Sequence, residues 1–387
     1  MVGRSKRVAF APLLLFSIAV FVVLSGCTEG ERGILATVAI EEEIKKGNLP
    51  KGSNIGGIVR ASFDGNERYV TVVGIKVFTR AVDSTDWDEL TVPGNSALFI
   101  AGLDADATGS DNSSVMDEVY VVSGTNVYRL TDGLGWEFVY SPPSPATRID
   151  GMVTIKGDLF VSDNSGEVAV WENSTVDETP DATFTFNDGI LDGTYYDRND
   201  RYYIVGDKNL LAEVRDNSTT EWDVEAFSPV DSPRGIGSRD DTESDLLFVS
   251  TADGNVYVTD SDDPKSASWE NFGDVERPAS DVIWIDRLNN GNGGVLVSTE
   301  IRTASDITNF GDNARGYYEG ELSGSTGNYS GTFTNDIGKS YGASDLAVHS
   351  IGSFRHFGNG VVFALTRGLG LWSTTYPDSA NPEWRWE

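Results

Sequence analysis

Apolar and polar residues alternate through most of the chain after residue 50, a pattern typical of half-buried β-strands. The alternating stretches are rich in valine, isoleucine and aromatic residues, and clusters of Gly, Asn, Asp and Ser separate them at short intervals. Apolar residues at helical spacing are scarce in the same region. The pattern therefore predicts an all-β protein.

One unit of this pattern recurs along the chain. It consists of an apolar strand, a tight polar turn, a second alternating strand and a polar turn that ends at an aromatic residue. The clearest copy is DLLFVSTADGNVYVTDSDDPKSASW, residues 245–269. The centres of the second strand recur 41 to 62 residues apart, at Val77, Val127, Val168, Leu211, Val256, Tyr318 and Leu371. Seven units are therefore present.

A further apolar stretch lies between successive copies, so each repeat holds four short strands; in the last repeat we assign this stretch to SDLAVHS, residues 344–350. Four strands at this period are typical of a propeller blade, whose two faces are buried by its neighbours in a closed ring. We therefore predict a seven-bladed β-propeller with four-stranded antiparallel blades over residues 34–387. A partial eighth copy around Leu35, as a closing strand or an incomplete blade, is an alternative. A pair of β-sandwiches or a β-helix fits less well, because we find no central linker and no shorter period.

An aromatic residue stands near the end of each unit, where the blades of a propeller splay apart. We expect these side chains to fill the gaps between blades: Trp87, Trp136, Phe184, Trp222, Trp269, Tyr329 and Trp384. The preceding turns, such as LTDGLGW and DSDDPKSASW, resemble the Asp-box hairpin of sialidase-like propellers in degenerate form. That resemblance implies a folding device and no reaction.

The first 27 residues have the layout of a bacterial secretory signal. Arg4, Lys6 and Arg7 precede an apolar run from Val8 to Leu24. The tetrapeptide LSGC that ends at Cys27 resembles the lipobox of bacterial lipoproteins. The resemblance implies a signal peptide over residues 1–26, lipidation of Cys27 and a tether over residues 27–33. It also implies a protein anchored in the cell envelope, and Thr28, which is not the inner-membrane retention aspartate, favours the outer membrane or cell surface. An uncleaved membrane anchor is the competing interpretation.

The chain is strongly acidic, with a formal net charge of −31. Cleavage before Cys27 removes three positive charges and no acid, which changes the net charge to −34. So negative a surface excludes nucleic acid as a plausible partner. Because Cys27 is the sole cysteine, the protein has no disulfide bonds.

Candidate catalytic and metal-binding residues are few. Only His349 and His356 are present, which excludes a three-histidine zinc site, and neither stands in a nucleophile motif. The segment from Asp104 to Ser114 resembles a calcium loop but has Val115 where the bidentate glutamate is expected. We therefore predict no metal and no cofactor. Glycoside chemistry needs a pair of carboxylates, and no sequence pattern singles out such a pair among the 60 acids.

Basic residues recur in the loops that lead from one repeat into the next, at the predicted mouth of the central channel. Five of the seven loops carry one: Lys51, Arg148, Arg234, Arg277 and Lys339. We predict that they bind an anionic ligand, such as an acidic glycan or an acidic protein segment. The predicted function is a lipid-anchored envelope propeller that acts as a binding or scaffold module. A glycoside hydrolase or polysaccharide lyase on the same fold is the alternative, so enzymatic activity stays open, with binding favoured.

Overall fold

The computed structural model describes residues 47–104, 115–172, 176–217, 220–239, 245–286, 288, 293–310, 316–325, 328–334, 350–358, 360–375 and 384–387. Gly47–Glu387 form one compact unit. The predicted signal peptide, Cys27, the partial copy at Leu35, Lys339 and His349 lie outside the described residues, as does the calcium-like loop beyond Asp104. Within the described residues, no helix combines the length and apolar content needed to cross a bilayer.

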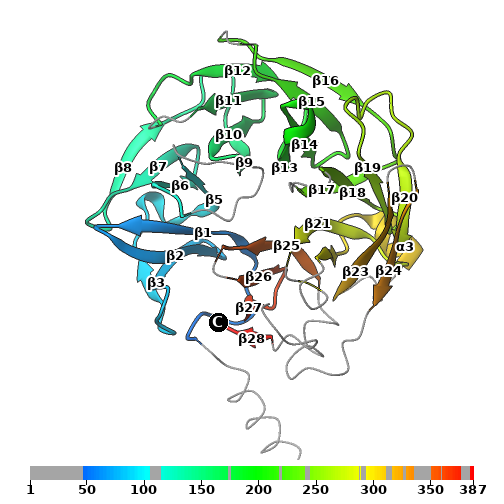
Figure 1. The fold of residues 1–387 in the computed structure, drawn as a ribbon. Coiled ribbons are helices and arrows are strands. Elements are labelled where there is room, and N and C mark those ends of the chain that lie inside the picture. The colour runs from blue at the N-terminus through cyan, green and yellow to red at the C-terminus, as the bar shows by residue number, and fades with distance from the viewer. Residues whose placement is uncertain are drawn as a thin grey trace, which may run out of the picture. The chain divides into compact units, whose positions relative to one another are not determined.

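The unit contains seven four-stranded antiparallel sheets, each built from four consecutive strands (Figure 1). The innermost strands are β1 (Ile55–Phe63), β5 (Ala97–Leu103), β9 (Ile149–Ile155), β13 (Ile190–Tyr196), β17 (Pro233–Arg239), β21 (Ala279–Ile285) and β25 (Ile351–His356). The second strands are β2 (Asn66–Val73), β6 (Glu118–Ser123), β10 (Asp158–Asp163), β14 (Arg201–Gly206), β18 (Leu246–Thr251), β22 (Gly294–Thr299) and β26 (Val361–Thr366).

The third strands are β3 (Lys76–Ala81), β7 (Asn126–Leu130), β11 (Glu167–Trp171), β15 (Leu211–Arg215), β19 (Asn255–Thr259), β23 (Gly316–Ser325) and β27 (Leu371–Thr375). The outer strands are β4 (Asp88–Leu90), β8 (Trp136–Tyr140), β12 (Ala182–Thr185), β16 (Asp223–Phe227), β20 (Glu270–Asp274), β24 (Asn328–Thr334) and β28 (Arg385–Trp386). The short helix α3 (Ala304–Phe310) and the 3-10 turns η1 (Pro93–Asn95) and η2 (Asp197–Asn199) interrupt the strand pattern.

The predicted seven-bladed propeller is confirmed. From β1 to β25, each inner strand contacts the inner strand of the following blade, and β1 of the first blade contacts β26 of the last. All seven residues that mark the repeat in the sequence fall on the third strand of a blade. One assignment was wrong: the inner strand of blade 7 is β25, not residues 344–350. The sequence of β25, IGSFRH, has no apolar run, because an inner strand faces the channel along part of its length.

The core consists of separate apolar clusters, each shared by two neighbouring blades. One cluster joins Phe160 and Phe184 of blade 3 to Tyr202 and Trp222 of blade 4. Trp384 packs edge-on against Tyr317 of blade 6, with ring centroids 5.6 Å apart. Five of the seven aromatic residues predicted to fill these gaps are buried, and Trp136 and Trp269 are partly buried. Burying both faces of each sheet is what makes the repeat stable as a ring.

The ring closes where the two ends of the unit meet. The backbone N–H groups of Gly47 and Leu49 donate to the carbonyl oxygens of Trp386 and Glu387, at 3.3 and 3.1 Å. The chain that leads into blade 1 therefore runs beside β28, the outer strand of blade 7. This agrees with the prediction that the ends of the propeller lie close together.

The side chain of Glu387 links blades 1 and 7. It is fully buried and lies 3.2 Å from Nη2 of Arg80, which is 2% exposed. Trp87 Nε1 donates to the other carboxylate oxygen, Oε2, at 3.1 Å, and the hydroxyl of Ser373 donates to Oε1, the oxygen that faces Arg80. The guanidinium of Arg80 also stacks on the rings of Tyr69 and Trp87. A buried carboxylate with this many donors is a fixed part of the ring closure.

Candidate functional site

A cavity of about 390 Å³ lies among the inner strands of the propeller. Its wall includes residues of every inner strand except β17. Most of these residues belong to the first half of a strand. We call the end of the ring at which the inner strands begin the mouth face; the connections between second and third strands lie at the same end. The cavity reaches this face through residues such as Asn54, Gly74 and Arg367.

A β-bulge near the start of each inner strand sets which side chains face the channel. The bulge occurs in all seven blades, always within the first three residues of the strand. A bulge turns the following side chain out of the regular pleat. The residues that follow the bulges are Gly57, Phe99, Gly151, Asp192, Gly235, Asp281 and Ser353. The same backbone device therefore places an aromatic ring, two carboxylates and a hydroxyl around one channel.

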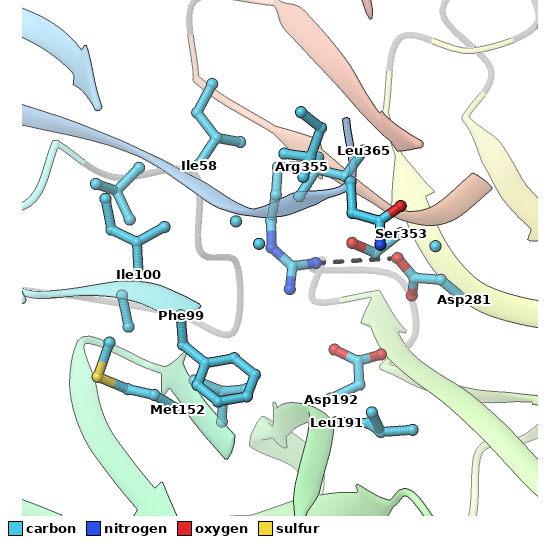
Figure 2. A pocket seen from close by; sticks show the side chains of 18 of the residues that line it. Ile58, Phe99, Ile100, Met152, Leu191, Asp192, Asp281, Ser353, Arg355 and Leu365 are labelled. Atoms are coloured by element: carbon cyan, nitrogen blue, oxygen red, sulfur yellow. Dashed lines mark ion pairs between the residues drawn. The ribbon is translucent and has the colours of Figure 1, made fainter. Parts of the chain in front are cut away.

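The charged part of the cavity wall is formed by Asp192, Asp281 and Arg355 (Figure 2). Asp281 is 1% exposed; its Oδ2 accepts the N–H of Phe354 at 2.8 Å and lies 3.9 Å from Nη1 of Arg355. Oδ1 of Asp281 is buried without a hydrogen-bond partner among the described residues. Asp192 accepts the N–H of Ile236 at 3.0 Å. One oxygen of each carboxylate thus ties its blade to the next one.

Arg355 presents an unused edge to the cavity. Its Nη1 donates to the carbonyl of Phe354 at 2.8 Å, whereas Nε and Nη2 form no hydrogen bond within the part of the chain that the structure describes. Figure 2 shows the guanidinium extending into the space between Phe99 and the two aspartates. The Nε–Nη2 edge of an arginine is the one that binds a carboxylate through two parallel hydrogen bonds.

Asp192 is the titratable group of this site. Its burial raises the pKa of the carboxyl to about 8, and the neighbouring charge of Asp281 acts in the same direction. Arg355 and the N–H of Ile236 oppose the increase. A hydrogen bond between the Asp192 and Asp281 side chains also favours the protonated form of Asp192 at neutral pH.

The opposite part of the wall is apolar. Ile58, Phe99, Ile100 and Met152 line it from three different blades, as Figure 2 shows, and Leu191 adds an apolar side chain beside Asp192. Their side chains leave room for an apolar group of a ligand next to the charged part. A concave site with an apolar wall and a few convergent polar groups is typical of ligand binding.

Two further arginines stand where the cavity meets the mouth face, and both are paired with Glu300. This glutamate is fully buried; Arg367 Nε lies 2.6 Å from it, and Arg302 Nε also donates to it. Arg302 Nη2 is bonded to the carbonyl of Ser280 at 3.0 Å. Glu300 raises the pKa of Arg367, which keeps that guanidinium charged. The cavity wall thus has three arginines and two aspartates.

The four predicted basic residues that the structure describes lie outside this cavity. Arg148 is bonded to Asp150 at 2.5 Å, and the buried Arg234 to Asp306 at 3.3 Å. Lys51 lies over the ring of Trp386 and Arg277 over that of Tyr318. None of these four lines the cavity wall. Anion binding at the four described positions stays a prediction, and the arginines that do line the wall come from other segments.

Sequence reasoning missed Asp192, Asp281 and Arg355 because nothing in their local sequence distinguishes them among the 60 acids and 29 basic residues of the chain. A usable signal exists in retrospect. Asp192 and Asp281 are each the third residue of an inner strand. This shared position can be recognised only when the first residue of each strand is known. Arg355 lies two residues beyond the equivalent Ser353, on the strand that the sequence misplaced.

Exposed aliphatic residues occur at several places on the mouth face. The described residues include five large apolar side chains with high exposure, and four of them belong to this face: Ile75, Leu98, Leu210 and Ile307. Ile75 and Leu98 are adjacent, since the N–H of Ala97 donates to the carbonyl of Ile75 at 3.0 Å. Leu98 is 40% exposed and also lines the cavity. The cavity is therefore continuous with the exposed pair Ile75 and Leu98.

Comparison with known proteins supports the fold class. No protein-family model and no curated protein matches the chain. The structure of YCF48 bound to D1 peptide is similar with a TM-score of 0.54 and 12% identity, over 86% of this chain and 94% of that chain. BBS1N in complex with ARL6DN gives 0.55 and 12%, over 88% and 96%. Streptogramin B lyase gives 0.51 and 12%, over 85% and 95%. At this identity the likeness shows the propeller fold alone.

Proposed function

We propose that this protein is a lipid-anchored component of the cell envelope whose propeller binds a protein partner at the mouth face. The observation that carries the proposal is the continuity of the cavity with the exposed pair Ile75 and Leu98. A contiguous apolar patch beside a concave polar site is typical of a protein-binding surface. Two of the similar structures are complexes with a peptide or a protein, which supports a partner of the same kind.

A hydrolase that uses Asp192 and Asp281 is the second candidate. The two inner-strand carboxylates face one cavity, and their environments differ, as an acid and a base require. One oxygen of each is, however, already bonded to the backbone of the neighbouring blade. A role in blade-to-blade contacts accounts for those bonds without any reaction, so binding is the better-supported function.

Partner binding can be tested with a paired substitution on the mouth face. We expect Ile75→Asp with Leu98→Asp to abolish retention of a specific envelope protein by the immobilised full chain, because charges would replace its central apolar contacts. Phe138→Asp is the matched control, since Phe138 is 48% exposed but lies on the outer strand β8. The measurement is affinity capture with identification by mass spectrometry. Equal capture by both variants, or binding only to a glycan array, would contradict the proposal.

Lipid anchoring can be tested at Cys27, the residue at the end of LSGC. We expect Cys27→Ala to move the protein from the membrane fraction to the soluble fraction or to block processing, because acylation needs the thiol. Fractionation and intact mass measure both effects. A variant that stays processed, membrane-bound and unchanged in mass would show that Cys27 carries no lipid. Cys27→Ser keeps nearly the same side-chain shape but lacks the thiol, so it should show the same loss of anchoring as Cys27→Ala.

A further inference from the structure

The cavity has a polar arrangement suited to one particular group on the partner. Its charged part offers the unused Nε–Nη2 edge of Arg355, and Asp192 lines the same part of the cavity. The apolar part begins at Phe99, across the same space (Figure 2). A group that fits must therefore accept hydrogen bonds at one end and carry an apolar portion beside it.

The charges of the wall indicate the sign of that group. Arg302, Arg355 and Arg367 line the cavity together with Asp192 and Asp281. Asp281 balances one of the three positive charges. The buried Glu300 is paired with Arg302 and Arg367 and balances a second one. With Asp192 protonated, one positive charge remains unbalanced, and Arg355 is the arginine whose Nε and Nη2 have no partner among the described residues.

We propose that the cavity binds a carboxylate carried next to an apolar side chain, with Arg355 as the anchoring residue. Such a group is supplied by the C-terminus of a polypeptide with an apolar last residue, or by an Asp or Glu side chain beside an apolar residue. The inference rests on the proposed protein-binding function and specifies the chemistry of its central contact.

Asp281 does not oppose this binding mode. Its Oδ2 lies on the Nη1 side of Arg355 and accepts the N–H of Phe354, so the Nε–Nη2 edge stays open. The carboxylate of the ligand would meet a guanidinium whose charge Asp281 only partly offsets at 3.9 Å. Bidentate binding by arginine is stronger than a single charged contact because it adds a second hydrogen bond in fixed geometry.

The test uses small probes and the full chain purified in detergent. We expect N-acetyl-phenylalanine to bind in calorimetry at pH 6.5, and its amide, which lacks the carboxylate, to bind at least tenfold more weakly. A third probe, N-acetyl-Phe-Asp-amide, carries only a side-chain carboxylate. Binding of this probe assigns the side-chain source; binding of the first probe alone assigns the C-terminal source. Equal binding of the acid and the amide would overturn the proposal.

Variants locate the binding to Arg355. Arg355→Gln should weaken binding of N-acetyl-phenylalanine at least tenfold, whereas Arg148→Gln should leave it unchanged, because Arg148 is exposed outside the cavity. Thermal unfolding of both variants checks that the ring is intact. Loss of binding in Arg148→Gln with retention in Arg355→Gln would reverse the assignment and favour the loop cations.

The pH dependence of binding tests the role of Asp192. The groups that face Asp192 are Asp281 on β21, Arg355 on β25 and the N–H of Ile236 on β17, with Arg302 and Arg367 also on the cavity wall. The ligand carboxylate favours the protonated form of Asp192, so affinity should fall by up to tenfold per pH unit once the pH exceeds about 8. In Asp192→Asn, which keeps a neutral donor, affinity should not change between pH 6 and 9. Wild-type affinity that is constant or rises with pH would contradict the role of Asp192.

Failure of this inference differs from failure of the proposed function. If the mouth-face variants abolish protein capture but no carboxylate probe binds, the protein-binding function stands and the carboxylate proposal is wrong. If the probes bind through Arg355 but no protein is captured, the cavity takes a small carboxylate and the protein-binding function is wrong.

Discussion

Replacing Glu387 by alanine is expected to lower the free energy of unfolding by about 3–5 kcal/mol, because it leaves a buried arginine without its acid. Arg80 would keep its ring contacts and the carbonyl of Ser84 at 2.6 Å, but lose the carboxylate at 3.2 Å. Trp87 Nε1 and the hydroxyl of Ser373 would lose their acceptor as well. These contacts join blades 1 and 7, so the substitution weakens the closure of the whole ring.

The measurement is urea unfolding at neutral pH, followed by tryptophan fluorescence. Glu89→Ala in the same blade is the matched control. Glu89 pairs with Lys76 at 2.8 Å on the surface, where both side chains are about half exposed, so its loss should cost less than about 1 kcal/mol. Similar stability losses in the two variants would mean that the buried contact does not hold the ring closed.

Replacing Trp222 by alanine should cost about 3–5 kcal/mol, the range for removing a large buried aromatic side chain. Trp222 is 4% exposed, stacks on Tyr202 at 5.3 Å and meets Phe160 of the preceding blade at 5.9 Å. The cavity left behind would lie between blades 3 and 4, where both sheets depend on it for burial. Trp222→Phe should recover roughly half of the loss.

Trp269 provides the matched control for Trp222, because it stands at the corresponding place before the outer strand of blade 5. It is only partly buried, and its Nε1 donates to the carbonyl of Pro264 at 2.8 Å. Trp269→Ala should therefore cost clearly less than Trp222→Ala in the same denaturant measurement. Equal losses would show that burial between blades is not what sets the contribution of these aromatic residues.

The repeat could be predicted because each blade must bury two faces with the same strand lengths, so its apolar spacing recurs in the sequence. All seven repeat markers, Val77 to Leu371, lie on the third strand of a blade. The inner strand of blade 7 was misplaced because β25 holds Gly352, Ser353 and Arg355 where an apolar run was expected. The channel, unlike the gaps between blades, does not require apolar residues.

The candidate site could not be predicted for a related reason. Asp192 and Asp281 are 89 positions apart in the sequence, and their proximity depends on the curvature of the ring and on a bulge at the same place in two strands. The predicted cations followed from loop position alone. Arg148 and Arg234 do lie at the starts of inner strands, but each is paired with an acid, Asp150 and Asp306 respectively, and neither lines the cavity.

The sequence by itself determined the all-β class, the number of blades and the aromatic residues between them, because these follow from periodic burial that every repeat must satisfy. It also carries the lipobox-like LSGC at Cys27, a local signal that needs no fold to be recognised. Only the tertiary structure decided which charged side chains share the channel. Their pairing depends on distances across the ring, and on which edge of Arg355 the neighbouring blades leave open.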